Sequence, residues 1–186
     1  MKSLDIYLDL DGVLVDLVAG LIHGHNLNMT HEDVTKWEIS DIAGIPYDDF
    51  WGCFGKEFWA NLPRTPEFDK YINMLDKWNP IICTSPTKFE GCTEGKIKWI
   101  EWNLPRYWAR GRFIITPKKH LIAQPDTLLI DDYDQNCVEW ERAGGVSILV
   151  PRPWNGMKHF SGCSFDWVER SFNSQILFLL HNSYNN

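Results

Sequence analysis

The fold of this chain is decided by the stretch DIYLDLDGVLVD, residues 5–16. Its first half alternates apolar and polar residues, which is the period-two pattern of a β-strand, and Gly12 ends the alternation. Two carboxylates, Asp9 and Asp11, therefore stand two residues apart where an apolar strand finishes. What such a pair does depends on the residues that the rest of the chain brings to the same place.

Four later apolar runs, each bounded by turn residues, predict further short buried strands. They are PIICTS (80–85), RFIIT (112–116), TLLIDD (127–132) and GVSILVP (145–151). Helical patterns separate them at 65–78, 91–103 and 134–143, and a last helix with an apolar stripe follows Ser164, a plausible N-cap. Strands that alternate with helices indicate βαβ units, so the sequence predicts an α/β fold with a Rossmann-like, doubly wound parallel sheet.

One interval breaks this alternation. About 70 residues separate the first strand from the second, far more than a crossover needs, and they read as helices over 14–25, 31–37, 47–60 and 65–78. This is where an inserted helical cap would sit. The predicted division is a core made of residues 1–16 and 79–186, with a cap over residues 17–78.

Composition excludes several classes of protein. A net charge of −7 argues against a surface for duplex nucleic acid, which needs clustered lysines and arginines. No apolar run reaches the roughly 18 residues of a membrane span, and the acidic N-terminal stretch is unlike a secretory signal. The five cysteines form no CxxC pair and are odd in number, which favours reduced thiols. We therefore expect a cytoplasmic protein without a membrane partner.

Polar side chains gather where three predicted strands end, and open α/β sheets bind their ligands beyond those carboxyl ends. Besides the first pair these are Thr84 and Ser85 after the second strand, and Asp131 and Asp132 after the fourth. Two like charges about 4 Å apart repel by about 4 kcal/mol at an effective dielectric constant near 20. Converging carboxylates thus require a cation, and an all-oxygen site without histidine or cysteine favours Mg²⁺. Hydroxyl groups and lysines such as Lys96 and Lys119 suit a phosphoryl group.

Each of these features has an ordinary structural reading on its own. A single DxD or DD at a strand end is often a turn or a helix cap, CTSP is usually a helix N-cap, and Lys96 alone is most often a solvated helix residue. Their occurrence together and in this order, each at a strand end or a helix start, favours a functional site.

The order of these motifs resembles that of the haloacid dehalogenase superfamily of phosphohydrolases. The quoted elements are DLDGVLVD, ICTSP, a lysine carried on a helix, and LLIDD. The combination of ICTSP with LLIDDYDQN resembles more narrowly the 5'(3')-deoxyribonucleotidase family, over residues 4 to about 155. The resemblance implies a phosphatase that releases phosphate from (deoxy)nucleoside monophosphates and takes part in nucleotide pool control or salvage.

The resemblance also implies roles for single residues. Asp9 would be the nucleophile that forms an aspartyl phosphate, and Asp11 the general acid and then the general base. Mg²⁺ would be held by the Asp9 carboxylate, the Asp11 main-chain carbonyl and Asp132, with Asp131 in support. Thr84 and Ser85 would grip phosphate oxygens, Lys96 would shield the nucleophile from the phosphate charge, and Lys119 stands in the place of a second family lysine.

In such a family the insertion would be a cap that closes over the site and excludes water. Phe58 and Trp59 match an aromatic pair that faces the base, and Leu17 stands where relatives often carry an aromatic residue, as a third wall of the base pocket. Trp37 and Trp51 are better interpreted as cap core than as partners for the base.

Other functions stay open at this stage. A phosphatase for sugar phosphates or for nucleic-acid 3' ends would use the same chemistry, although the acidity of the chain weighs against a polynucleotide. A signalling receiver domain carries a similar acidic cluster, but in a different order along the chain, and a non-catalytic binding protein could share the fold. The preferred base and sugar, the choice between 5' and 3' esters, and the oligomeric state, monomer or homodimer, are left undecided.

Overall fold

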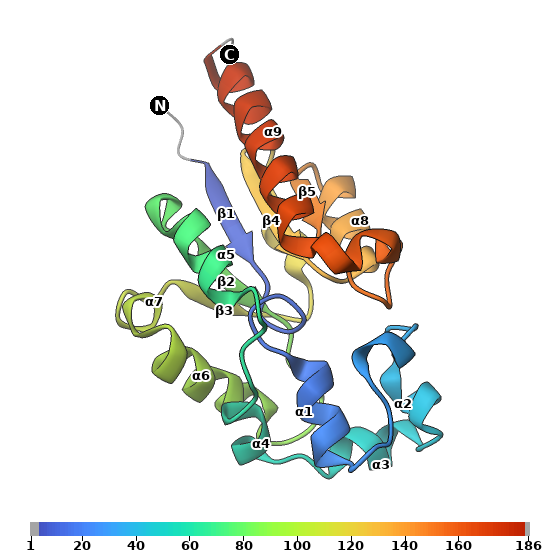
Figure 1. The fold of residues 1–186 in the computed structure, drawn as a ribbon. Coiled ribbons are helices and arrows are strands. Elements are labelled where there is room, and N and C mark those ends of the chain that lie inside the picture. Colours follow the sequence, from blue (N-terminus) through green and yellow to red (C-terminus); the bar gives the residue numbers. More distant parts are fainter. Residues whose placement is uncertain (1–3, 185–186) are drawn as a thin grey trace.

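The computed structural model describes residues 4–184 and has a five-stranded, all-parallel sheet with helices on both faces (Figure 1). The strands are β1 (Asp5–Leu8), β2 (Ile81–Thr84), β3 (Phe113–Ile115), β4 (Thr127–Asp131) and β5 (Val146–Leu149), in the order β3-β2-β1-β4-β5. Parallel pairing on both sides of β1 sets Leu8 beside Ile82 and Ile130. The α/β fold with a parallel sheet that the sequence predicts is therefore confirmed.

The helices fall into two groups. Those between β1 and β2 are α1 (Leu17–Gly24), the 3₁₀ helix η1 (His31–Asp33), α2 (Ile39–Ala43), α3 (Tyr47–Gly52), α4 (Lys56–Ala60), α5 (Phe68–Leu75) and η2 (Asp76–Trp78). Those after β2 are α6 (Cys92–Asn103), α7 (Pro105–Ala109), η3 (Lys119–Ile122), α8 (Asp134–Arg142), η4 (Lys158–Cys163) and α9 (Ser164–Tyr184). Helix α9 thus includes Ser164 as its first residue instead of starting after it as a cap.

The alternation seen in the sequence of β1 divides its side chains between two cores. Ile6 and Leu8 belong to a large cluster that also holds residues of α5, α6 and α9, whereas Tyr7 points to a smaller cluster that contains Trp140 of α8. Burial of apolar surface stabilises by about 25 cal/mol per Å². Because both faces of β1 are buried, a shift of the strand by one residue would move these side chains to the opposite faces of the sheet, so the position of the strand, and of the aspartates that follow it, is fixed. The carboxyl ends of β1, β2 and β4 meet at one edge of the sheet.

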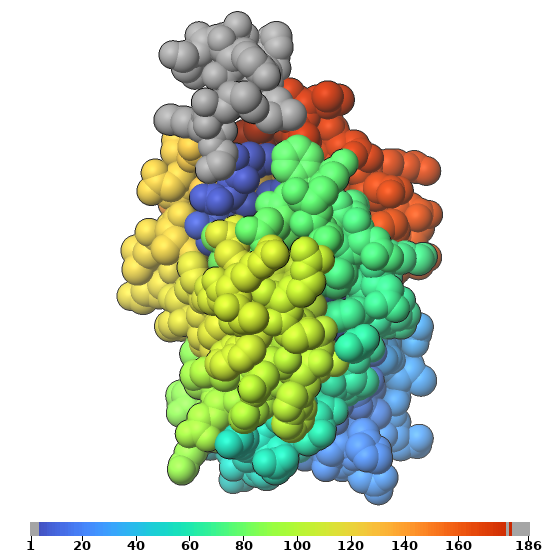
Figure 2. Space-filling model, turned by 90° about the vertical axis from the view of Figure 1, so that its left-hand side faces the viewer, coloured from blue at the N-terminus to red at the C-terminus, as the bar shows by residue number. Residues whose placement is uncertain are grey.

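Helices α1 to α4 form the end of the molecule that faces this edge (Figure 1). Figure 2 shows the same blue-to-teal segments in the lower part of the view, next to the yellow-green atoms of α6 and α7. Helix α4 packs closely on α6, because Gly95 leaves room: a Cβ there would lie 2.4 Å from Trp59 Cβ and 2.5 Å from the Lys56 carbonyl oxygen. Helix α5, which the sequence assigns to the cap, contacts α9 and lies beside the sheet. By these contacts it belongs with the sheet layer.

Two helices of the insertion differ from the sequence prediction. The helix predicted over 31–37 is only the short η1, because the β-branched Val34 and Thr35 are weak helix formers and Val34 is buried as the chain turns away. The helix predicted over 47–60 is broken into α3 and α4, because Gly52 and Gly55 interrupt it. The extended segment after η1 brings Trp37 and Glu38 to the sheet edge, where they matter below.

Candidate active site

The first acidic pair lies in a tight turn after β1. The amide of Asp9 donates to the carbonyl of Ile130 at 2.9 Å, and the amides of Leu14 and Val15 return to the Leu10 carbonyl. Gly12 has a φ of +70°, and a Cβ on it would lie 2.0 Å from Asp132 Oδ2. Only glycine fits a left-handed position packed this closely against a carboxylate, so the DxDG motif follows from the shape of the turn.

The second acidic pair follows β4 and is held by its own donors. Asp131 accepts hydrogen bonds from the amide of Tyr133 at 2.9 Å and from Asn136 Nδ2 at 3.0 Å. Asp132 Oδ2 accepts from Trp154 Nε1 at 2.9 Å. Both side chains are completely or almost completely buried, so these contacts fix where each carboxylate points.

Three carboxylates converge between the two strand ends. One oxygen each of Asp9, Asp131 and Asp132 lie within 4.8 Å of one another, and Asp132 Oδ1 is buried without a hydrogen-bond partner among the described residues. An unsatisfied buried carboxylate oxygen costs free energy unless a ligand occupies its lone pairs. The donor set is entirely oxygen, as a hard divalent cation prefers. The residues therefore fit a Mg²⁺ ion.

Two buried lysines contact three of the four acidic residues. Lys119 Nζ lies 2.5 Å from Asp9 Oδ1 and 2.7 Å from Asp131 Oδ2. Lys96 Nζ contacts Asp11 Oδ2 and donates to Thr84 Oγ1 at 2.9 Å. The sequence assigned the shielding of Asp9 to Lys96, but the structure places Lys119 against that carboxylate. Four carboxylates against these two ammonium groups leave an excess of negative charge that a divalent cation would neutralise.

Burial and charge shift the acid–base properties of the site. Burial raises the pKa of Asp9 to about 7; the Lys119 ammonium works against this shift, and the carboxylates of Asp131 and Asp11 add to it. Burial, together with Asp131 and Asp9, likewise holds the pKa of Asp132 well above its usual range. Burial opposes the charge on Lys119, but Asp131 and Asp9 outweigh it and raise the pKa of this lysine. Lys119 is thus a permanent cation beside Asp9.

The end of β2 presents Ser85 and Thr87 to the open space in front of the acidic cluster. The hydroxyl of Ser85 donates to the Thr116 carbonyl at 3.1 Å. Thr84, which the sequence predicted as a phosphate ligand, is fully buried behind this lining and binds Lys96 instead. The side chain of Thr84 therefore positions a lysine, and Ser85 is left as the exposed hydroxyl of the predicted pair.

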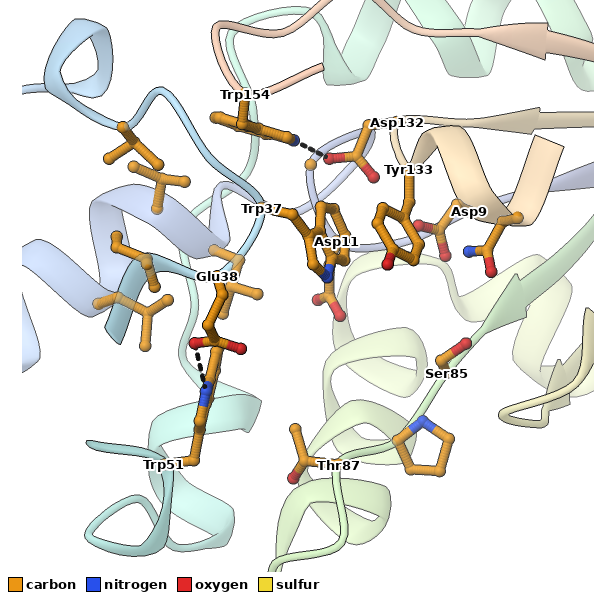
Figure 3. Close-up of a pocket in the computed structure, with 18 of the residues that line it drawn as sticks. Asp9, Asp11, Trp37, Glu38, Trp51, Ser85, Thr87, Asp132, Tyr133 and Trp154 are labelled. Atoms are coloured by element: carbon orange, nitrogen blue, oxygen red, sulfur yellow. Dashed lines mark hydrogen bonds between the residues drawn. The ribbon is translucent and has the colours of Figure 1, made fainter. Parts of the chain in front are cut away.

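A cavity of about 310 Å³ opens in front of the acidic cluster (Figure 3). Asp9, Asp11, Asp132, Lys119 and Ser85 lie at one part of its wall. Aliphatic and aromatic residues of the insertion form another part, namely Leu17, Val18, Leu21, Val34, Trp37, Ile39, Tyr47, Trp51 and Trp59. Small-molecule sites are typically largely apolar with a few placed polar groups, so this is the candidate active site.

The structure changes the predicted aromatic lining. Leu17 and Trp59 line the cavity as expected, but Phe58 lies outside its lining and stacks on Phe54, with ring centroids 3.7 Å apart. Trp51, which the sequence favoured as cap core, is buried in the large hydrophobic cluster and also lines the cavity, and Trp37, favoured in the same way, lines the cavity. Trp37 is 44% exposed. Trp37 lies on an irregular segment and Trp51 on a helix whose bounds the sequence did not predict, so periodicity could not show which of these rings faces the cavity.

Other lining residues were not predicted as part of the site, among them Glu38, Tyr133 and Trp154. Tyr133 follows Asp132 directly, so its place after β4 was a usable signal. Glu38 and Trp154 lie on irregular segments without periodicity, and nothing in the sequence distinguishes them from surface residues.

Comparison with known proteins agrees with this geometry. The profile of the family described as "5' nucleotidase, deoxy (Pyrimidine), cytosolic type C protein" matches residues 2–172. The human cytosolic-type 5'(3')-deoxyribonucleotidase is 27% identical over 154 residues, which cover 72% of each chain. Among solved structures, the HAD-hydrolase YfnB of Bacillus subtilis bound to magnesium shares the fold, with a TM-score of 0.51 and 11% identity over 81% of this chain and 87% of that one.

Since the family profile spans nearly the whole chain and the acidic cluster lies where the motifs place it, the chain belongs to the cytosolic type C 5' nucleotidase family, phosphoric monoester hydrolases of the haloacid dehalogenase superfamily.

Proposed function

We propose that this enzyme hydrolyses (deoxy)nucleoside monophosphates to nucleoside and phosphate, in the cytoplasm, with Mg²⁺ as cofactor and through an aspartyl phosphate on Asp9. The observation that carries the proposal is one cavity that joins the acidic cluster to an aromatic wall. A phosphate group fits the polar part of such a cavity, and a nucleobase fits the apolar part.

Asp9 is the proposed nucleophile because it lies at the cavity wall between Lys119 and the other carboxylates. Its carboxylate oxygen attacks phosphorus, a new O–P bond forms, and the ester bond to the sugar oxygen breaks. Asp11 gives its proton to the departing sugar oxygen. Asp11 then accepts a proton from a water molecule, whose oxygen attacks phosphorus, releases inorganic phosphate and returns Asp9 as a carboxylate.

Mg²⁺ would be held by the carboxylates of Asp9 and Asp132 and the main-chain carbonyl of Asp11, with Asp131 in support through its contacts with Lys119 and Asn136. When bound, the cation supplies positive charge that favours the ionised form of the buried carboxylates and attracts phosphate oxygens. Asp132 Oδ1, which is buried without a hydrogen-bond partner among the described residues, would gain a partner in such a site.

The two lysines would serve the phosphate differently. Lys119 lies at the cavity wall beside Asp9, where it offsets the repulsion between the nucleophile and a phosphate dianion. Lys96 is bound to Asp11 and Thr84. In this position it restrains the carboxylate that exchanges protons with the leaving group.

The same chemistry on another small phosphate ester, or on a nucleic-acid 3' end, is the alternative. The net charge of −7 weighs against a polynucleotide. The apolar wall built from the tryptophans and leucines around α1 to α4 favours a substrate with a flat, apolar part, which sugar phosphates lack.

Phosphate release from a panel of deoxyribo- and ribonucleoside 5'- and 3'-monophosphates tests this function. We expect release with Mg²⁺, none after chelation of the metal, and loss of turnover in Asp9→Asn while its circular dichroism spectrum still shows the folded α/β protein. Asp69→Asn, which removes an exposed carboxylate from α5, is the matched control and should be fully active. Release from sugar phosphates alone would contradict the nucleotide assignment.

A further inference from the structure

Glu38 presents a carboxylate to the part of the cavity that lies away from the acidic cluster. It precedes α2 and shares the cavity wall with Trp37 and Trp51. Figure 3 shows Glu38 with Trp51 on one side of the cavity and Ser85 with Thr87 on the other. A half-buried carboxylate is an unusual component of an apolar wall, because desolvation of a charge is costly unless partners compensate it.

The two oxygens of this carboxylate are not equivalent. Oε1 accepts hydrogen bonds from Trp51 Nε1 at 3.1 Å, from Ser40 Oγ at 2.7 Å and from the Ser40 amide at 3.2 Å. These three donors fix the orientation of the group and occupy one oxygen. Oε2 accepts none of the hydrogen bonds found among residues 4–184, so it is left for a ligand.

The charge of Glu38 is also uncompensated by the protein. Among the side chains that the structure describes, no lysine, arginine or histidine nitrogen lies within 4.0 Å of its carboxylate. The tyrosines Tyr47 and Tyr133 lie close enough to feel its field, which contributes to the raised pKa of both, after burial as the main cause. A ligand N–H group would therefore meet an oriented acceptor oxygen.

Resting on the proposed function, we propose that Glu38 selects the base: its Oε2 accepts a hydrogen bond from the amino group on C4 of cytosine or C6 of adenine, so nucleoside monophosphates of these bases are preferred over those of uracil and hypoxanthine. Cytosine and adenine present an amino group where uracil and hypoxanthine present a carbonyl oxygen. A carboxylate can only accept, so it attracts the amino group and repels the carbonyl. The wrong base would be disfavoured, because its carbonyl oxygen carries a partial negative charge and would face the Glu38 carboxylate.

Two matched substrate pairs test the inference. The pairs are dCMP with dUMP and dAMP with dIMP, each differing in an amino group against a carbonyl. We expect kcat/KM of the wild-type enzyme to favour the amino member of each pair by about 10- to 100-fold, the range of a hydrogen bond to a charged group. Glu38→Gln should bring both ratios close to one, since an amide can donate as well as accept.

Glu57→Gln is the matched control, because it removes the same charge from an exposed position on α4 outside the cavity lining. It should leave both ratios unchanged. Melting temperatures of the two variants in Mg²⁺ show whether the anchoring of Trp51 survives, and the wild-type ratios test the inference without any variant.

The outcomes separate this inference from the function on which it rests. Two results would overturn base selection alone and assign Glu38 to holding Trp51. One is release of phosphate from all four nucleotides without preference for the amino members. The other is an equal loss of activity on both members of a pair in Glu38→Gln. Absence of release from all four would overturn the proposed function and the base selection with it.

Discussion

The indole of Trp37 stacks on the phenol ring of Tyr133, with the ring centroids 4.0 Å apart and the ring planes 19° from parallel. Trp37 belongs to the segment between η1 and α2, whereas Tyr133 follows Asp132 at the end of β4. Both rings line the cavity. The pair therefore joins the insertion to the strand end that carries the acidic cluster, across the wall of the active site.

Loss of this stack should weaken substrate binding more than turnover. An aromatic pair is worth about 0.5–1.5 kcal/mol, so we expect Trp37→Ala to raise KM by about two- to tenfold with a smaller change in kcat. Trp102→Ala on α6, where the indole is 56% exposed, is the control and should leave KM unchanged. A fall in kcat at constant KM would show that the stack does not contribute to binding.

Gly12 is the backbone position on which the proposed metal site depends. Gly12→Ala would place a methyl group on Asp132 at a left-handed φ of +70°, and displacement of a catalytic group by about 1 Å costs roughly 10²-fold in rate. We expect at least that loss of kcat/KM, together with weaker Mg²⁺ binding measured by calorimetry. Gly55→Ala is the control, because nothing lies within 4 Å of the added Cβ, and it should change neither kcat/KM nor Mg²⁺ binding. Full activity of Gly12→Ala would refute the close packing of Gly12 against Asp132.

Lys119 is the cation that compensates two buried carboxylates. Removing one partner from a buried ion pair destabilises by about 3–5 kcal/mol, so Lys119→Met should lower the melting temperature strongly and abolish turnover. Added Mg²⁺ should recover part of the stability, because it supplies positive charge at the same carboxylates. Lys98→Met is the control, because it removes a half-exposed lysine of α6 that pairs with Glu101, and it should have little effect on stability. Comparable falls in melting temperature in the two variants would contradict the role of Lys119 as the cation that compensates Asp9 and Asp131.

The convergence of the acidic residues could be predicted because local patterns determine it. The period-two alternation before Asp9 and the apolar run before Asp131 each define a strand, and parallel strands must end at the same edge of the sheet. Chain order alone thus placed Asp9 near Asp132. Gly12, which follows Asp11, indicated in addition that the strand ends there in a turn.

The choice between the lysines and the identity of the cavity wall could not be predicted in the same way. Lys96 and Lys119 both follow strands, but which one reaches Asp9 depends on how α6 and η3 pack, and α6 is positioned by its contact with α4. Trp37 and Glu38 lie on a segment that the sequence predicted partly as helix. An irregular segment has no periodicity that would show which side chains face the cavity.

A pair of residues near the start of the insertion makes the stability of the folded protein depend on pH. His31 Nε2 lies 2.7 Å from Asp16 Oδ1, and Asp16 also caps α1 by accepting from the Ala19 amide at 3.0 Å. The hydrogen bond to Asp16 raises the pKa of His31 above 6.5, while burial opposes the shift. His31 then binds its proton more tightly in the folded state, so the stabilisation is complete below about pH 6.5 and is lost as the pH rises through the raised pKa.

Asp16→Asn tests this pair, because asparagine keeps an oxygen for the Ala19 amide and caps helices as well as aspartate does. We expect the pKa of His31, followed by NMR titration of its ring protons, to return towards its ordinary value in this variant, and the stability advantage of the wild type to disappear as the pH rises through the raised pKa. Asp69→Asn on α5 should leave the His31 titration as it is. An unchanged His31 pKa in Asp16→Asn would mean that the charge of Asp16 does not hold η1, and with it the segment that carries Trp37 and Glu38, against the start of α1.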